Sequence, residues 1–392
     1  MLENNHIKNE KSYLPNLSSL KIIFSIWKII SSKRKIQFFF VISLMSISGL
    51  LELTLIRYLL PLINYFVNPL TTNNDLLIFN NVQSLIRNFI EIDINTLNII
   101  FYSLLVLIST FLKLTTLWIN ERYVARLGND ISYKAFSFSI RLTYSEQISK
   151  NSSNLIAAIN KALDDTTDYI KCITKGIYFL IISLTISIGL FSISFNISLL
   201  AIIILSFIYL IVSKYSKDKL ILNGKKIFSS YTNQTQLVQE GLGSIRDLIV
   251  NRSYKFYETS FSKSDISKRK AYADNSFLTA FPKILIEGIG IIIVLFLLYL
   301  LNIYNPNENG QNLGVIAAFA FGCQKLLPAI QTIYTMLSRL RSRKESVIKI
   351  LNILNDKNKN PYKNLKEINT SIIFQNINLQ NVSFKYKVSK NW

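Results

Sequence analysis

Six long apolar segments divide this chain of 392 residues, and they restrict its fold more than any other feature. A helix needs about 20 apolar residues to cross the hydrocarbon core of a bilayer. Inside a membrane every backbone polar group must find a partner within the protein, and a helix meets this demand by itself. We therefore predict an all-α integral membrane protein. The predicted spans are 38–66, 97–118, 177–195, 196–212, 284–301 and 313–336.

Lysine and arginine alternate with these spans along the chain. They are frequent before the first span, between the second and third, between the fourth and fifth, and after the sixth, and they are scarce in the other connections. Because basic residues gather on the cytoplasmic side, we predict a multi-pass protein of the cytoplasmic (inner) membrane with both termini in the cytoplasm. The same distribution accounts for most of the net charge of +21. We therefore do not expect nucleic acid as a partner.

The chain offers few side chains for metal or redox chemistry. Its two cysteines, Cys172 and Cys323, lie far apart in apolar stretches, and its one histidine, His6, lies in a polar N-terminal stretch. No metal-ligand spacing and no disulfide framework can be built from them. We expect no metal site and two buried free thiols. The first 20 residues also lack the features of a secretory signal.

The two long basic connections, 119–176 and 213–283, contain few helix breakers and repeat apolar residues at three- and four-residue steps. A helical extension of 25 residues would project about 40 Å beyond the membrane. We therefore predict that the spans continue as long cytoplasmic helical stalks; two separate helical hairpins are the alternative. The outer segment 74–96 has the spacing of a short amphipathic helix, either on the membrane surface or packed on the bundle.

The composition changes after residue 354. Residues 355–370 are polar and are predicted to form a linker, followed by two strand-like runs at 371–374 and 377–386. Two strands cannot bury a core of their own, so we expect them to begin a larger domain that this sequence does not complete. The predicted organisation is an N-terminal cytoplasmic segment (1–37), a transmembrane domain (38–354), a linker (355–370) and the start of a further domain (371–392).

This order of features, together with the stretch Ile377-Asn-Leu-Gln-Asn-Val-Ser-Phe-Lys-Tyr386, resembles a half-size ABC exporter. The nucleotide-binding domain of that family opens with a strand of the form I-x-L-x-N-V-S-F-x-Y. The resemblance implies a six-helix membrane domain followed by the first two strands of an α/β ATP-binding domain. It also implies a dimer with a second copy of the chain or with a paralogous half-transporter, surrounded by membrane lipids.

The resemblance extends to segments that transmit motion between the two kinds of domain. Stretches around residues 144–165 and 239–249 are similar to the family's coupling segments, although plain amphipathic stalk helices would give a related pattern. Tyr386 matches the aromatic residue that stacks on adenine, although a strand tyrosine can also serve only for packing. The matching coupling residues are Tyr144, Glu146, Gln239, Glu240, Ile245 and Arg246.

The phosphate-binding motif of the family, G-x-x-x-x-G-K-[ST], does not occur in this sequence. The resemblance therefore implies that ATP and Mg²⁺ bind only through a nucleotide-binding domain supplied in cis or in trans, and that this chain alone does not hydrolyse ATP. A truncated gene model, one piece of a split gene and a remnant are the explanations that we consider.

Three short stretches resemble the branch of the family that moves lipid-linked oligosaccharides and polysaccharides. They surround Glu52, extend from Phe281 to Glu287, and extend from Gln324 to Ala329. This likeness implies ATP-driven movement of a lipid-linked glycan, or a similar amphipathic cargo, from the cytoplasmic side outward. A peptide, lipid or drug exporter is the alternative within the family, and a non-transporting membrane scaffold or truncated remnant is the alternative outside it.

Charged residues inside the predicted spans are the candidate cargo site, because such residues are costly in a bilayer and usually face protein or a water-filled cavity. In one hypothesis, Arg57, Lys113 and Lys325 line a cavity that neutralises a phosphate-bearing headgroup. In the other, the carboxylates pair with nearby cations, and Arg57 and Lys113 extend to the membrane interface. The five candidate residues are Glu52, Arg57, Lys113, Glu287 and Lys325.

Overall fold

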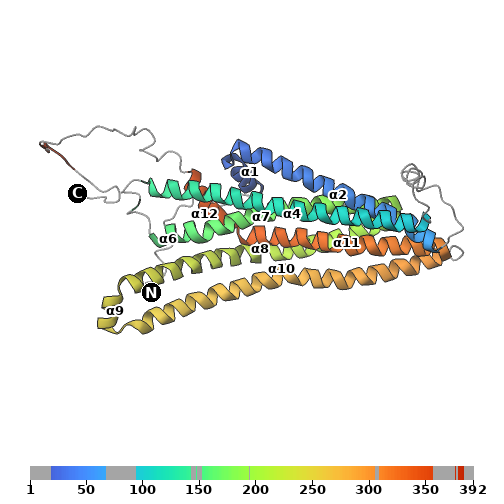
Figure 1. Cartoon of the computed structure of the whole chain (residues 1–392). Helices are drawn as coiled ribbons and strands as arrows, with labels where there is room; N and C mark the ends of the chain where they lie inside the picture. Colours follow the sequence, from blue (N-terminus) through green and yellow to red (C-terminus); the bar gives the residue numbers. More distant parts are fainter. Residues whose placement is uncertain are drawn as a thin grey trace.

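The computed structural model describes residues 19–67, 94–142, 147, 152–193, 195–304, 309–355, 376 and 378–383. Almost all of these residues are helical, and the helices lie side by side as an elongated bundle (Figure 1). The helices are α1 (Ser19–Ile29), α2 (Ser32–Val67), α4 (Ile94–Ile140), α6 (Ser152–Ala157), the π-helical turn η2 (Ala158–Ala162), α7 (Leu163–Ile193), α8 (Phe195–Gly243), α9 (Ile245–Asn251), α10 (Tyr254–Tyr304), α11 (Asn309–Ser342) and α12 (Lys344–Asn355).

Four helical segments within the described residues are long and apolar enough to cross a membrane, which supports an all-α membrane protein. They belong to α2, α4, the continuous α6–η2–α7 helix and α10. The two other predicted spans, 196–212 and 313–336, lie within α8 and α11. Because the structure describes only part of the side chains in those two stretches, six spans remain a prediction.

Three helices continue far beyond their apolar parts, as the periodicity of the basic connections predicts. Helices α4, α8 and α10 contain 47, 49 and 51 residues. At 1.5 Å per residue each is at least about 70 Å long, more than twice the roughly 30 Å of a hydrocarbon core. Helices α8 and α10 run as a pair over much of this length, and α9 closes the end of the pair (Figure 1).

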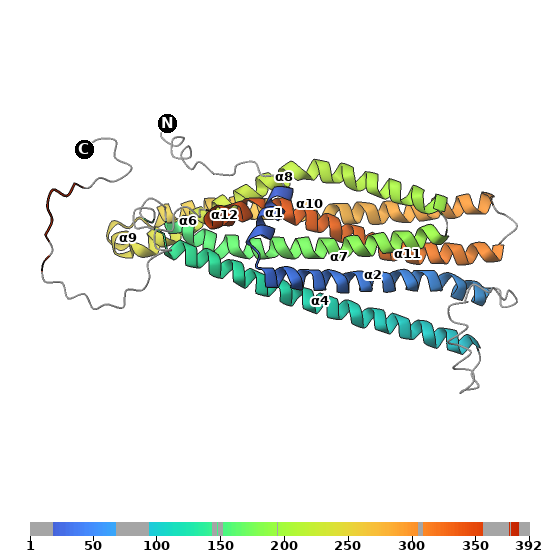
Figure 2. The same ribbon diagram turned by 90° about the horizontal axis from the view of Figure 1, so that it is seen from above.

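Helix α7 is the centre of the bundle, since α2, α4, α11 and α12 all pack against it (Figure 2). Small residues permit these close contacts. A Cβ on Gly128 of α4 would lie 2.7 Å from the Thr167 side chain, and one on Gly322 of α11 would lie 2.4 Å from that of Leu190. The α8–α10 pair meets the remaining helices mainly through α11.

The turn between α7 and α8 matches the predicted tight connection between the third and fourth spans. Helix α7 ends at Ile193 and α8 begins at Phe195. The hydroxyl of Ser198 on α8 donates a hydrogen bond of 2.8 Å to the backbone oxygen of Leu190 on α7. The two helices therefore form a hairpin.

Helix α1 is an element that the sequence interpretation missed, because residues 1–37 were expected only to be a cytoplasmic segment before the transmembrane domain. Its side chains Ile22 and Ile26, one turn apart, are buried against the core, whereas Leu20 and Phe24 are exposed. Trp27 at its end packs against Phe38 of α2 with 5.2 Å between ring centroids. The bundle therefore includes residues before the first predicted span.

The predicted strand at 377–386 is wrong for the residues that the structure describes there. Residues 378–383 form no strand, and Leu379 and Val382 are exposed. Asn381 has a φ of 53°, in the left-handed region, which interrupts an extended run. No described strand is available to pair with this stretch, and a strand without a partner is not stable in water. The predicted strand 371–374 and residues 74–93 of the predicted outer helix 74–96 lie outside the described residues, and residues 94–96 belong to α4.

Candidate functional site

Three of the five candidate intramembrane charges meet in the bundle. Glu52 of α2 is held between Lys113 of α4 and Lys325 of α11. The ammonium nitrogen of Lys325 lies 2.6 Å from Glu52 Oε1, and that of Lys113 forms an ion pair with Oε2. Sequence positions far apart thus form one cluster, which we call the Glu52 triad.

The Glu52 triad combines a deeply buried carboxylate with two cations that reach toward the surface. The Glu52 side chain is 4% exposed, whereas those of Lys113 and Lys325 are 33% and 25% exposed. With both lysines and the carboxylate ionised, the triad carries one excess positive charge. The excess charge and the partial exposure of the ammonium groups allow an anionic oxygen to approach them, which is a chemical property suited to a phosphate group.

Uncharged polar groups surround the triad, and the sequence interpretation did not include them. The Ser48 hydroxyl, one turn from Glu52 on α2, shares a 3.3 Å hydrogen bond with the Tyr178 hydroxyl of α7. Ser109, one turn from Lys113 on α4, is also buried. The Lys325 ammonium lies 4.5 Å from the centre of the Phe321 ring. The four-residue spacing of serine and charge within apolar helices is the signal that could have revealed this polar face.

The structure does not bring Arg57 or Glu287 into the triad. Both side chains are exposed, and neither forms an ion pair with another described residue. Arg57 lies on α2 beyond Glu52, and Glu287 lies on α10. Glu52 pairs with nearby cations, as the hypothesis of structural ion pairs states. Its two partners, Lys113 and Lys325, are also two of the three cations that the other hypothesis assigns to the cargo cavity.

The second candidate coupling segment lies at the far end of the α8–α10 pair. Gln239 and Glu240 belong to the end of α8, and Ile245 and Arg246 begin the short helix α9. Arg252, with a φ of 52°, terminates α9 in the left-handed conformation before α10 begins. Helix α9 runs across the end of the pair, far from the apolar parts of the helices (Figure 1).

This end of the pair exposes a group of apolar side chains. Ile249 and Val250 are 57% and 74% exposed, Leu242 is 70% exposed, and Ile245 is also exposed. Clustered apolar side chains on an exposed surface are typical of a protein–protein contact. We call these four residues the α9 tip. The other candidate coupling residues, Tyr144 and Glu146, and the candidate adenine-stacking Tyr386 lie outside the described residues.

A polar cluster joins α8 and α10 between the α9 tip and the apolar part. Asp265 of α10 accepts hydrogen bonds from Arg269, at 2.5 Å, and from Gln234 of α8, at 3.0 Å. These bonds, that of Arg269 first, lower the pKa of Asp265 to about 2. Lys268 also pairs with Asp265 and donates to Gln234. These contacts tie the two helices together between the tip and the apolar part of the bundle.

A second polar cluster fixes α12 to the start of α7. Asp165 accepts hydrogen bonds from Lys161, at 2.8 Å, and from Ser346 of α12, at 2.7 Å. Arg343, between α11 and α12, donates a 2.7 Å hydrogen bond to Asp168. The π-helical turn that carries Lys161 packs against α12. Such turns are frequent at functional sites, and this one provides part of the surface against which α12 packs.

The two cysteines are free, with Cys172 buried and Cys323 half-buried. The Cys172 sulfur lies 4.0 Å from the Arg343 guanidinium in the cluster just described.

No protein-family model matches the chain.

Proposed function

We propose that this chain is the membrane-spanning part of an ATP-driven ABC exporter or flippase, moving a lipid-linked glycan or a similar anionic amphipathic molecule outward from the cytoplasmic side. In this proposal the chain pairs with a second copy or a paralogous half-transporter, and ATP and Mg²⁺ bind to a nucleotide-binding domain supplied in cis or in trans. Six spans and two cytoplasmic termini complete the proposed topology. The alternation of basic residues along the sequence supports it.

The observation that carries the proposal is the α8–α10 pair with its α9 tip. Two helices of 49 and 51 residues extend well past their apolar parts and end in a short helix with exposed apolar side chains. A transporter driven by a separate motor domain needs a lever and a docking surface, and this helix pair with its α9 tip can supply both. Closure of two nucleotide-binding domains would draw the tips of two subunits together and change which side of the membrane the cargo site faces.

The Glu52 triad supports an anionic cargo. Its two lysines belong to α4 and α11, and its carboxylate belongs to α2. A phosphate oxygen that binds the lysines competes with Glu52 for the same ammonium groups. Cargo binding would thereby loosen the connection among three helices, and cargo release would restore it. This exchange gives the site a way to link the presence of cargo to helix movement.

We expect Ile249→Asp to weaken docking of the nucleotide-binding domain at least about tenfold, because a charge replaces an exposed apolar contact at the proposed interface. The measurement is chain-stimulated ATP hydrolysis in proteoliposomes, as a function of the concentration of a nucleotide-binding domain added in trans. The thermal unfolding midpoint of the chain itself should not change, since Ile249 is 57% exposed.

Ile266→Asp is the matched control, because Ile266 is 51% exposed on the same helix pair but lies away from α9. We expect this control to leave docking unchanged. Equal docking by wild type and Ile249→Asp, or an equal defect in both variants, would contradict the assignment of α9 as the coupling helix.

A further inference from the structure

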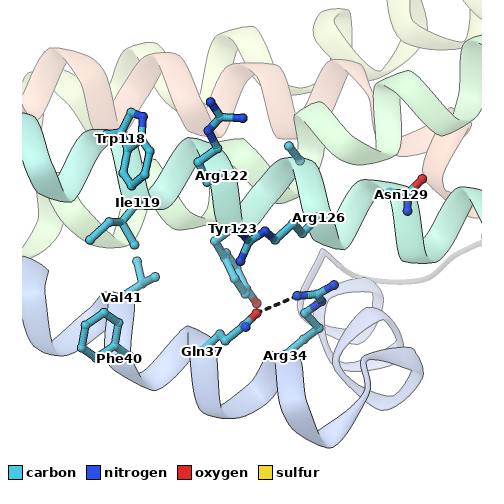
Figure 3. Close-up of a pocket in the computed structure, with 11 residues that line it drawn as sticks. Arg34, Gln37, Phe40, Val41, Trp118, Ile119, Arg122, Tyr123, Arg126 and Asn129 are labelled. Carbon is cyan, nitrogen blue, oxygen red and sulfur yellow. Dashed lines mark hydrogen bonds between the residues drawn. The ribbon is translucent and has the colours of Figure 1, made fainter.

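A pocket of about 740 Å³ lies between α2 and α4, apart from the Glu52 triad. Figure 3 shows its two walls, with Gln37 and Phe40 on α2 and Trp118, Arg122 and Arg126 on α4. Gln37 precedes Glu52 by 15 residues on the same helix, which corresponds to about 22 Å along the axis. None of the three triad residues lines this pocket, which makes it a separate site.

The two ends of this pocket differ in chemistry. Phe40, Val41 and Trp118 line one end, and Gln37 and the arginines of α4 line the other (Figure 3). The change occurs where the apolar part of α4 ends, since Trp118 is the last residue of the apolar segment 97–118. Tryptophan is enriched at membrane–water interfaces. The pocket therefore spans the boundary between acyl chains and headgroups.

The polar end carries positive charge that the described residues do not neutralise. Arg34 forms a two-bond ion pair with Asp130, at 2.7 and 3.2 Å, and also donates to Gln37. Arg122 and Arg126 form no ion pair with a described acidic residue, and the pocket lining contains no carboxylate. Two guanidinium charges are thus available.

The positions of these arginines suit one phosphate group. Arg122 and Arg126 are one helical turn apart on α4 and both line the pocket, so rotation about their side-chain bonds can bring the two guanidinium groups to neighbouring oxygens of one phosphate. The Arg122 guanidinium lies 5.6 Å from the centre of the Trp118 ring, which orients it at the membrane boundary. Guanidinium groups form paired, charge-assisted hydrogen bonds with phosphate oxygens.

We propose that this pocket binds an anionic phospholipid of the surrounding leaflet, with the phosphate between Arg122 and Arg126 and an acyl chain against Phe40, Val41 and Trp118. The apolar end is what favours a membrane lipid over free phosphate, because a soluble anion gains nothing from that wall. Basic pockets between membrane helices commonly hold lipid headgroups. The bound lipid would bridge α2 and α4 at the membrane boundary and stabilise their contact.

The test is native mass spectrometry of the full chain in detergent, titrated with dioctanoyl phosphatidylglycerol. We expect saturable binding, and at least about tenfold weaker binding in the double variant Arg122→Gln/Arg126→Gln, which removes two charge-assisted contacts. The matched control is Lys217→Gln/Lys219→Gln, which removes the same charge from an exposed part of α8 and should bind normally. The double variant Arg122→Lys/Arg126→Lys keeps the charge but loses the paired hydrogen bonds of the guanidinium groups. We expect its lipid binding to lie between that of the wild type and that of the glutamine double variant. The lysine double variant serves as the test if the glutamine double variant does not fold.

Two further probes identify the ligand. Dioctanoyl phosphatidylcholine, which has no net charge, should bind at least about tenfold more weakly than phosphatidylglycerol, because phosphatidylglycerol brings net negative charge to two cations. Inorganic phosphate should not displace the lipid at equal concentration. Equal binding of the two lipids, displacement by inorganic phosphate, or unchanged binding in both Arg122/Arg126 variants would overturn the proposal.

Discussion

The Glu52→Ala variant is expected to unfold with a free energy about 3 kcal/mol lower than that of the wild type. The substitution leaves Lys113 and Lys325 without their counter-ion, and losing one partner of a buried ion pair costs about 3–5 kcal/mol. The low end of that range applies because the two lysine side chains are 33% and 25% exposed. The measurement is the thermal unfolding midpoint in detergent, followed by tryptophan fluorescence.

Glu287→Ala is the matched control, since Glu287 is also a carboxylate in a predicted span but is exposed. We expect its midpoint to remain near that of the wild type. The triple variant Glu52→Leu/Lys113→Met/Lys325→Met should recover most of the lost stability, because an apolar replacement of a whole buried ionic cluster is often neutral or stabilising. Similar midpoints for Glu52→Ala and Glu287→Ala would show that the triad does not hold the bundle together.

The Gly224→Ala variant is expected to lose about 3 kcal/mol of stability, at the high end of the usual cost of overpacking. A Cβ at this position of α8 would lie 2.0 Å from the backbone oxygen of Ser342 and 2.9 Å from its carbonyl carbon. Both are backbone atoms at the end of α11, so no side-chain rotation can relieve the clash and the two helices must separate.

The same junction contains a hydrogen-bond network that the separation would break. Asn223 donates a 3.0 Å hydrogen bond to Asn275 of α10, which in turn donates a 2.7 Å hydrogen bond to Ser342. Arg341 also donates to the backbone oxygen of Ser213 on α8 at 2.8 Å. The α8–α10 pair would thus lose its main connection to the rest of the bundle.

Gly288→Ala provides the control for Gly224→Ala. Gly288 is a helical glycine of α10, and a Cβ there meets no atom within 4 Å. Replacing an unhindered helical glycine with alanine stabilises a helix by up to about 1 kcal/mol. The two variants should therefore shift the thermal unfolding midpoint in opposite directions. An unchanged or raised midpoint for Gly224→Ala would show that the close approach of α8 and α11 is not needed for the fold.

The long helices were predictable because hydropathy, basic residues and periodicity are properties of the sequence itself. The extension of α4, α8 and α10 beyond the apolar parts follows from the small number of helix breakers in the basic connections. The missed helix α1 shows the limit of that reasoning. It is only 11 residues long, and it is held by the burial of Ile22 and Ile26 against the bundle rather than by its own length.

The partners of the intramembrane charges could not be deduced in the same way. Glu52 is 61 residues from Lys113 and 273 from Lys325 in the sequence, and only the packing of α2, α4 and α11 brings them together. Hydropathy marks each charge as unusual but does not say which face of its helix meets a neighbour. For the same reason the sequence alone did not reveal the pocket between α2 and α4, because its arginines follow the ordinary positive-inside distribution.

The most direct test of the proposed export function is ATP-dependent movement of a lipid-linked oligosaccharide with a fluorescent glycan across proteoliposomes. The vesicles would contain this chain with a nucleotide-binding domain in cis or in trans. We predict that ATP moves the probe out of the leaflet in which it is first present, and that Lys325→Met slows this movement at least about tenfold by removing a charge-assisted contact to phosphate, whereas Arg57→Gln has no such effect. Equal movement with and without ATP would contradict the proposed function.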